Sequence, residues 1–264
     1  MGVRVAAAVH GSQFPDKGAS AKYARVASDL CWLVPDGVRA EDAATFGVGF
    51  LTAAQFVVYG GSTSVGLFAI QIAKLLGFRV LTFCSPGSFD LVKHYGADAA
   101  FDYHDGVSAA DQGLALRGGV HHGLDCIATT ETVNMSLRCF ASGPGQLNVL
   151  GQVSEGSVTL PAGVKIGFIT TKTLFGRVRR PKAERDVHIR TLLTVSQAYK
   201  TSDGPLFPAS PQDREFGVKI YSQIPELITR KGIKPNPVEV LEGGLAGIPA
   251  GWERLRIRDE KQKL

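Results

Sequence analysis

The sequence predicts an α/β protein organised around a doubly wound parallel sheet. Short apolar runs alternate with helical segments between residues 56 and 150, which is the pattern of parallel strands joined by helices. A glycine-rich turn, 60–66, joins the first apolar run to the first of these helices. The 264 residues are enough for one large domain or two small ones.

The segment 56–83 contains a strand–helix–strand unit. The run 56–59 is rich in β-branched and aromatic residues, as in a buried parallel strand, and Gly77 ends the helix that follows the turn. The run 79–83 forms the second strand. Because Thr63 replaces the middle glycine of the pattern GxGxxG, the turn also fits a strand–turn–helix that holds no cofactor. Its hydroxyl groups nevertheless offer donors to a pyrophosphate at the helix N-terminus: Ser62, Thr63 and Ser64.

The same patterns predict the other elements. In the first 55 residues we expect strands at 4–9, 20–27 and 31–34 and a helix at 39–55. After the central unit we expect helices at 89–95, 108–116 and 131–140, alternating with strands at 99–103, 123–127 and 147–150. Towards the C-terminus we expect a strand at 172–178, a helix at 212–231, a returning strand at 237–241 and a helix at 245–257. In such a sheet a ligand binds at the carboxyl ends of the strands.

Composition makes several classes of protein unlikely candidates. Hydrophobic residues make up 44% of the chain and charged residues 20%, as in soluble proteins, and no apolar run is long enough to cross a membrane. The four cysteines are scattered and the six histidines lack metal-ligand spacing, so we expect no zinc and reduced thiols in the cytoplasm. No Ser-His-Asp order or GxSxG motif supports a hydrolase. The net charge of +5 suits a solvated face, or attraction of an anionic cofactor or carrier, better than nucleic acid.

The end of the second strand predicts which dinucleotide binds. NAD sites usually place a carboxylate there to hold the ribose hydroxyls, whereas the segment 83–88 contains none. Ser85 and Ser88 instead offer hydroxyl donors to a 2′-phosphate, and Lys93 follows one helical turn or so later. We therefore expect NADPH to be preferred over NADH. Tyr103, at the end of the third strand, is placed to stack on or hydrogen-bond an adenine, although a core or surface tyrosine fits the sequence equally.

Six segments together resemble a known family. They are LTAAQ (51–55), VYGGSTSVGLFAIQIAKLLG (58–77), CSPGSFDLVKHYGADAAFDYHD (84–105), GLDCIATTET (123–132), FPASPQDREF (207–216) and IKPNPVEVLEGGLAGIPAG (233–251). This set is similar to the fungal trans-acting enoyl reductases, zinc-free, toxD-like members of the medium-chain dehydrogenase/reductase superfamily. The resemblance covers nearly the whole chain. It implies NADPH-dependent reduction of the α,β double bond of a polyketide intermediate, held on the carrier domain of a partner polyketide synthase.

The resemblance also implies a set of site residues. The cofactor would be held by Ser62, Thr63, Ser64 and Val65 at the phosphates, by Ser85, Pro86, Gly87 and Ser88 at the 2′-phosphate, by Tyr103 on the adenine side, and by Leu150 and Gly151 near the nicotinamide. The substrate channel would be lined by Gly49, Phe50, Leu51, Thr52 and Ala53 and by Thr171, Lys172, Thr173, Leu174 and Phe175. Thr52 is the expected contact to the reacting acyl group, and hence the catalytic candidate. No acid–base pair stands out, because a positioned hydride transfer needs little beyond orientation and a proton source.

Two departures from the family pattern shape the expected domains. The family begins with a barrel-like, GroES-like catalytic half, and residues 1–55 are expected to be its residual end with the connecting helix. Residues 56–165 form the expected NADP-binding Rossmann domain, and 166–264 its remainder and the return to the catalytic half. In the family a helix continuation and a loop precede the first Rossmann strand, whereas here Gln55 joins Phe56 directly.

Three functions remain open on the sequence. The first is the trans-acting enoyl reductase, expected to be a cytoplasmic monomer whose partner is a polyketide synthase and which binds neither nucleic acid nor membrane. The second is a truncated, non-catalytic remnant that still binds dinucleotide or synthase. The third is a free quinone or alkenal reductase, which applies the same cofactor chemistry to a small soluble substrate.

Overall fold

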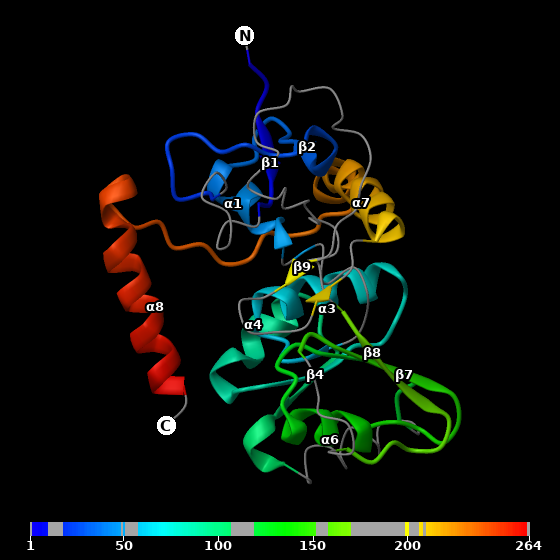
Figure 1. Ribbon diagram of the computed structural model, residues 1–264. Coiled ribbons are helices and arrows are strands. Elements are labelled where there is room, and N and C mark those ends of the chain that lie inside the picture. Colours follow the sequence, from blue (N-terminus) through cyan, green and yellow to red (C-terminus); the bar gives the residue numbers. More distant parts are fainter. Residues whose placement is uncertain are drawn as a thin grey trace.

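The protein is seen here as a computed structural model that describes residues 2–9, 18–48, 50, 58–106, 119–151, 158–169, 199–200, 206–207 and 210–262. Figure 1 shows the N-terminal segments and one long helix at one end, a parallel sheet with its helices at the other, and the last helix standing to one side. This arrangement confirms the predicted α/β class and its doubly wound parallel sheet.

Segments from both ends of the chain form the first of these regions. Strand β1 (Val5–Ala7) pairs antiparallel with β2 (Cys31–Leu33), the 3-10 helix η1 (Ser28–Leu30) leads into β2, and α1 (Ala40–Thr45) follows. Helix α7 (Pro211–Thr229) packs on η1 and β2. Arg214 of α7 places one guanidinium nitrogen 2.7 Å from each carboxylate oxygen of Asp29. This contact ties together positions that lie 185 residues apart in the sequence.

A six-stranded sheet forms the second region. Its spatial order is β5 (Ala99–Asp102), β4 (Leu81–Cys84), β3 (Val58–Tyr59), β6 (His122–Asp125), β7 (Gly145–Val149) and β8 (Val164–Phe168), and every neighbouring pair is parallel. From β3 the chain moves outward to β5 and then returns to place β6 on the other side of β3. The strand order therefore reverses at β3, and a reversal of this kind opens a crevice for ligands at the carboxyl ends of the strands.

The helices of the sheet region begin and end as their sequences predict. Helix α3 (Ser64–Leu75) buries Leu67, Phe68 and Ile70, and Gly77, with φ of +82°, turns the chain after it. Helix α4 (Phe89–His94) follows the 3-10 turn η2 (Pro86–Ser88). Helix α6 (Thr130–Arg138) starts with a reciprocal capping pair, in which Thr129 and Thr132 each accept from the other's backbone N–H.

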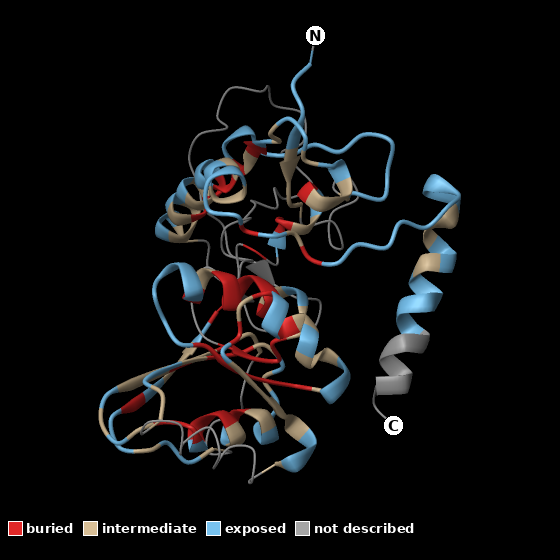
Figure 2. Ribbon diagram, turned by 180° about the vertical axis from the view of Figure 1, so that it is seen from behind, coloured by how far each residue is buried: buried red, intermediate tan, exposed pale blue. Residues whose placement is uncertain are grey.

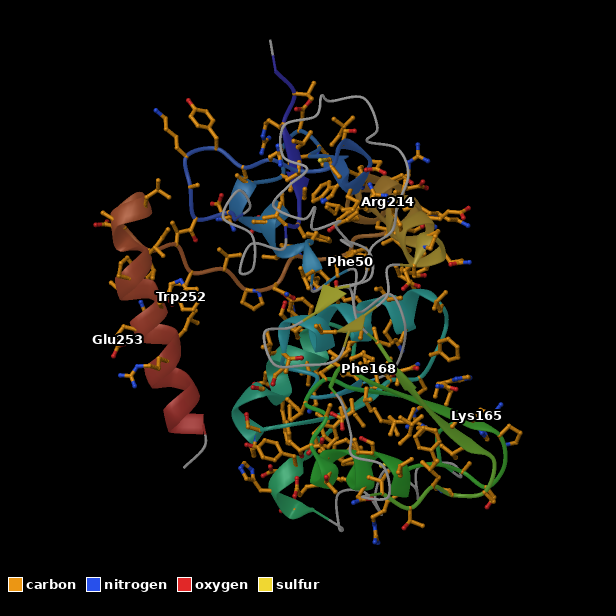
Figure 3. All side chains as sticks on the ribbon, in the orientation of Figure 1. Phe50, Lys165, Phe168, Arg214, Trp252 and Glu253 are labelled. Atoms are coloured by element: carbon orange, nitrogen blue, oxygen red, sulfur yellow. The ribbon has the colours of Figure 1, made fainter. Side chains whose placement is uncertain are left out.

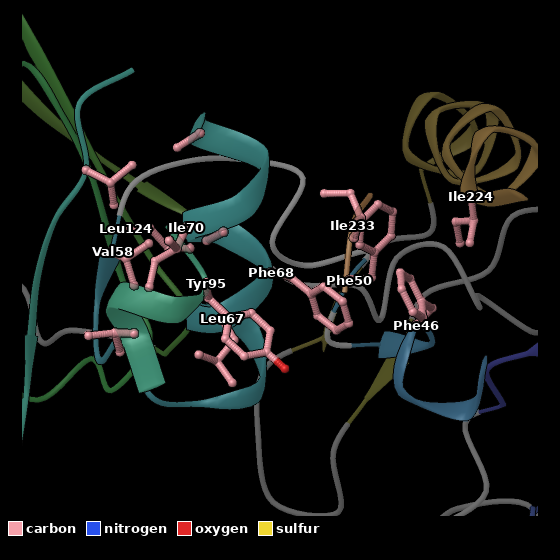
Figure 4. Close-up of a cluster of buried hydrophobic side chains, with 14 of the residues drawn as sticks. Phe46, Phe50, Val58, Leu67, Phe68, Ile70, Tyr95, Leu124, Ile224 and Ile233 are labelled. Atoms are coloured by element: carbon pink, nitrogen blue, oxygen red, sulfur yellow. The ribbon is translucent and has the colours of Figure 1, made fainter. Parts of the chain in front are cut away.

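One hydrophobic core joins the two regions. The Phe46 ring lies 4.9 Å from that of Phe68 on α3 and 5.5 Å from that of Phe50, while Trp32 of β2 meets Phe46 at 5.9 Å (Figure 4). The same cluster includes Ile224 of α7. The described residues among the first fifty therefore pack against the sheet's own helix α3 rather than forming a separate core.

Several predicted elements differ from the structure. The segments 20–27 and 237–241 are exposed and contain no strand, and among the described residues no strand pairs with either of them. The segment 158–169 contains β8, which we did not predict because Lys165 and Gly167 interrupt its apolar pattern. Helix α1 ends at Thr45, so the expected helix at 39–55 is interrupted by the turn at Phe46 and Gly47, and Val48 and Phe50 are again helical. The expected helix at 108–116 and strand at 172–178 lie outside the described residues.

The C-terminal part contains short strands and a separate helix. Strands β9 (Tyr199–Lys200) and β10 (Leu206–Phe207) pair with each other, and the 3-10 turn η6 (Gly244–Gly247) leads into α8 (Ile248–Gln262). Figure 2 shows α8 apart from the body of the molecule, and Trp252 on it is 72% exposed (Figure 3). Among the helices of the described residues, none has the length and apolar character needed to span a bilayer.

Candidate cofactor site

The expected cofactor residues gather at one edge of the sheet. Because β5, β4, β3, β6 and β7 run parallel, their carboxyl ends lie along the same edge. The turns after four of these strands contain the whole set: Tyr103 after β5; Ser85, Pro86, Gly87 and Ser88 after β4; Ser62, Thr63, Ser64 and Val65 after β3; and Leu150 and Gly151 after β7. The sequence thus predicted residues that the fold brings to a common edge.

Three glycines shape the turn after β3. Gly60 has φ of +79°, which favours glycine. A Cβ on Gly61 would clash with the Thr82 hydroxyl and lie 2.9 Å from Thr82 Cβ, and a Cβ on Gly66 would clash with the Gly60 carbonyl. The turn therefore needs glycine for its bend, for its approach to β4 and for the packing of α3 against it. Two of these needs, the bend and the helix packing, are those of a dinucleotide-binding turn, although Thr63 stands in the middle position.

Thr63 closes the turn from inside. Its hydroxyl donates to the carbonyl of Gly60 at 2.8 Å and accepts from the N–H of Gly66 at 3.0 Å, which makes it the N-cap of α3. The hydroxyl hydrogen of Thr63 is thus used within the protein, contrary to the expectation that it donates to phosphate. The hydroxyls of the exposed Ser64 and the half-buried Ser62, together with the N–H groups of Ser64 and Val65 in the first helical turn, remain the expected donors to phosphate.

A segment near the C-terminus crosses this part of the site. Gln71 of α3 accepts from the N–H of Lys234 at 2.7 Å and donates to its carbonyl at 3.1 Å. The hydroxyl of Tyr95 donates to the carbonyl of Pro235. The next residue, Asn236, donates from Nδ2 to the Ser64 hydroxyl at 2.7 Å. We call residues 233–236 the strap. They connect the helices after β3 and β4 to the turn 60–66, which we call the phosphate turn after the pyrophosphate that we expect it to hold.

The turn after β4 brings two hydroxyls together. Ser85 Oγ and Ser88 Oγ lie 3.4 Å apart, and both residues are half-buried. The nearest carboxylate along the chain is that of Asp90, in the first turn of α4. Pro86 and Gly87 are exposed between the two serines, so the turn is open to a ligand from outside.

Tyr103 follows β5 and is half-buried. It packs against the aromatic cluster of Tyr59 and Phe83, and its ring centroid is 4.0 Å from that of His104. Asp102 accepts from the N–H of His104 at 3.0 Å, and this backbone hydrogen bond, followed by the side-chain bond to the same histidine, lowers the pKa of Asp102. Packing thus fixes one side of Tyr103, and its remaining surface lies at the edge where we expect the adenine.

Asp125, at the end of β6, was missed by the sequence analysis. Its side chain is completely buried, and Oδ1 accepts from the N–H groups of Ile127 and Ala128, both at 2.8 Å. Oδ2 accepts from the hydroxyl of Thr132 at 2.7 Å. Burial raises the pKa of this carboxyl, and its hydrogen bonds oppose the rise. A lone aspartate inside the apolar run GLDCI was the signal that could have revealed it.

The bonds to Asp125 hold two turns beside one another. Ala128 has φ of +61°, a left-handed value that no other described non-glycine residue adopts. A Cβ on Gly151 would lie 2.9 Å from Ala128 Cβ, and Leu150 donates its N–H to the carbonyl of Asp125 at 3.1 Å. Asp125 therefore fixes the turn that Leu150 and Gly151 contact, at the end of the site where we expect the nicotinamide.

Most of the expected substrate residues lie outside the described part of the chain: Gly49, Leu51, Thr52, Ala53, Thr171, Lys172, Thr173, Leu174 and Phe175. Phe50 is described, and it does not line a channel. Its side chain is 1% exposed and packs between the rings of Phe46 and Phe68 (Figure 4). The catalytic role of Thr52 stays a prediction.

The fold and the glycine turn at its switch point define a class, the dinucleotide-binding dehydrogenases and reductases. The family described as zinc-binding dehydrogenase matches residues 64–186. The solved structure of the CurF ER cyclopropanase, from the curacin A biosynthetic pathway, matches with a TM-score of 0.63 and 16% identity over 89% of this chain and 64% of that chain. At this identity the match shows the fold alone.

Curated relatives identify the family within that class. The trans-enoyl reductase caaB of Aspergillus niger is 30% identical over 287 residues, which cover 97% of this chain and 73% of that protein. The trans-enoyl reductase mycC of Thermothelomyces thermophilus is 32% identical over 97% of this chain and 72% of that protein. The chain therefore belongs to the fungal trans-enoyl reductases, a family of oxidoreductases, as the sequence indicated. It spans about three quarters of the length of these relatives.

Proposed function

We propose that this chain is an NADPH-dependent trans-acting enoyl reductase, which reduces the α,β double bond of a polyketide intermediate on the carrier domain of a partner synthase. The observation that carries the proposal is the convergence of the turns after β3 and β4 at the switch point of the sheet. Family membership supports a nicotinamide cofactor and a reductive reaction. The names of the relatives, as trans-enoyl reductases, support a substrate that a separate synthase supplies.

The residues at the ends of different strands bind different parts of the cofactor. The N–H groups of Ser64 and Val65, at the positive end of the α3 dipole, bind the pyrophosphate together with the hydroxyl of Ser64. Ser85 and Ser88 donate to the 2′-phosphate, where a carboxylate would repel it. When bound, NADPH supplies the hydride for the reduction. Leu150 and Gly151 lie along the nicotinamide end, and the buried Asp125 keeps their neighbouring turn in place.

Orientation is the main contribution that we assign to the protein during the reaction. Hydride transfer depends on near-attack geometry, so misplacing a wall of the site by about 1 Å lowers the rate on the order of a hundredfold. We assign Thr52 to the contact with the reacting acyl group. The reduction also requires a proton on the α-carbon, and this step needs only a proton source near the site.

The experiment is a single-turnover measurement of NADPH oxidation by the purified chain. Three substrates are compared: an enoyl thioester on a carrier domain, the same acyl group on a small thiol, and a quinone. We expect the fastest oxidation with the carrier-bound thioester. Faster oxidation with the quinone favours the free quinone or alkenal reductase, and tight NADPH binding without oxidation of any substrate favours the non-catalytic remnant.

A further inference from the structure

The strap places a buried amide against the phosphate turn. Asn236 is 8% exposed, and its Nδ2 lies 2.7 Å from the hydroxyl oxygen of Ser64 and 3.2 Å from the carbonyl oxygen of the same residue. Its other side-chain atom, Oδ1, is buried and has no hydrogen-bond partner in the described part of the structure. These two residues lie 172 positions apart in the sequence.

The two contacts together fix which way the Asn236 amide faces. A carbonyl oxygen can only accept a hydrogen bond, so the atom beside the Ser64 carbonyl must be the donating Nδ2. That same NH₂ group therefore also donates to the Ser64 hydroxyl. A serine hydroxyl has a single hydrogen, and since its oxygen accepts from Asn236, this hydrogen must point away from the amide.

We propose that Asn236 is a positioning residue for the dinucleotide, because it presets the hydroxyl of Ser64 as a hydrogen-bond donor to a pyrophosphate oxygen. The inference rests on the proposed binding of NADPH. Ser64 is exposed and opens helix α3, where the backbone N–H groups also favour an anion. The neighbouring Thr63 differs from Ser64, because its hydroxyl already donates its hydrogen to the Gly60 carbonyl inside the turn.

The amide is held in place by contacts that do not involve Ser64. The backbone N–H of Asn236 donates to the hydroxyl of Thr45 at 3.2 Å. Lys234, two residues earlier in the strap, makes two hydrogen bonds to Gln71. The strap is therefore ordered by the core-facing helices before any ligand arrives. Such preorganisation lowers the entropy that binding must otherwise supply.

The test measures dissociation constants of NADPH and NADH by fluorescence, together with the midpoint of unfolding, for N236A, N236D, S64A and the double variant S64A/N236A. We expect N236A to weaken both dinucleotides about threefold to tenfold, as for one hydrogen bond. We expect N236D to weaken them on the order of tenfold to a hundredfold, because its carboxylate accepts the Ser64 hydrogen and repels phosphate. In the S64A background, N236A should have no further effect.

Q71A is the matched control, since it removes an anchor of the same strap without touching Ser64. It should lower the unfolding midpoint as much as N236A does while changing the dissociation constants less. The NADPH to NADH ratio should stay constant in N236A, because the pyrophosphate is common to both.

Three results would overturn the inference. N236A could weaken dinucleotide binding equally with and without Ser64, or Q71A could weaken it as much as N236A does. Either result would show that Asn236 only stabilises the fold, and the proposed function would stand. Failure of the unmodified protein to bind either dinucleotide would overturn both the inference and the proposed function.

Discussion

The backbone of Gly61 lies directly against the side chain of Thr82, the second residue of the neighbouring strand β4. A Cβ at Gly61 would clash with the Thr82 hydroxyl and lie 2.9 Å from Thr82 Cβ, and Thr82 is fully buried. The phosphate turn and β4 are therefore in contact without any space between them. The position of the turn over the sheet depends on this contact.

The first prediction concerns G61A. We expect it to destabilise the protein by about 1–3 kcal/mol, the usual range for overpacking, and to weaken NADPH binding because the turn must shift. Urea unfolding and a fluorescence titration measure the two effects. The control is G87A, because a Cβ on Gly87 meets no atom within 4 Å and should leave stability unchanged.

Adding T82A to G61A tests the cause. This change removes the hydroxyl and methyl groups of Thr82 but keeps its Cβ, so we expect partial recovery of stability. No recovery, or an unfolding free energy of G61A equal to that of the unmodified protein, would contradict the close contact.

The second prediction concerns the choice of cofactor. NADPH should bind more tightly than NADH, and S88D should move the preference towards NADH by at least about tenfold, because a carboxylate beside Ser85 repels the 2′-phosphate and accepts from ribose hydroxyls. Titration with both dinucleotides gives the ratio. S222D, on the exposed face of α7, adds the same charge away from the site and should leave the ratio unchanged. Equal affinity for both dinucleotides in the unmodified protein would refute the assignment of Ser85 and Ser88.

The third prediction concerns the buried carboxyl of Asp125. Burial raises its pKa above the ordinary value of 3.8, so between these two pKa values the folded state binds more protons than the unfolded state. Its contribution to stability therefore falls as pH rises through that window. We expect the stability of the unmodified protein relative to D125N to decline from about pH 4 towards neutrality. Urea unfolding of both proteins at several pH values measures the difference.

Asp98 provides a control of opposite sign. Burial acts to raise its pKa, but the Lys74 hydrogen bond at 2.8 Å, the Val80 N–H and the nearby charges together lower it below 3.8. Its contribution is therefore present at neutral pH and is lost as pH falls through the folded-state pKa. The advantage of the unmodified protein over D98N should disappear in acid. The same pH trend in D125N and D98N would show that neither carboxyl causes it.

The fourth prediction is that the purified protein contains no tightly bound zinc. All four cysteines are free, and the described residues contain no group of three or more His, Cys, Asp or Glu side chains that could hold a metal. The matched family is nevertheless described as zinc-binding dehydrogenase. Elemental analysis after dialysis against a chelator is the measurement, and one zinc per chain would refute the prediction.

The sequence predicted those parts of the fold that follow from local patterns. The strand–turn–helix around Gly60 and Gly66 depends on residues close together in the chain, so its pattern can be recognised in the sequence. The edge strand β8 was missed because Lys165 and Gly167 interrupt the run of apolar residues by which a buried strand is recognised. The expected strand at 237–241 was wrong, because a strand needs a neighbouring strand and local sequence cannot show whether one is present.

Parts of the site depend on contacts that sequence spacing does not reveal. The use of the Thr63 hydroxyl inside the turn follows from the bend at Gly60, which brings the carbonyl within reach. The bond from Asn236 to Ser64 joins positions that only the folded chain brings together. Phe50 was expected at a channel, but its ring completes a core with Phe46 and Phe68, and its apolar character fits either location.

The strap also determines when the phosphate turn can reach its final hydrogen-bonded arrangement during synthesis. A ribosome adds about 5–20 residues per second, so the 172 residues between Ser64 and Asn236 take roughly ten to thirty seconds to follow. Throughout that interval helix α3 exists without the amide that orients its first hydroxyl and without the partner of Gln71. A nascent chain halted before the strap should therefore form much of the sheet yet leave these polar groups exposed to water, and their final arrangement must wait until the strap has been made.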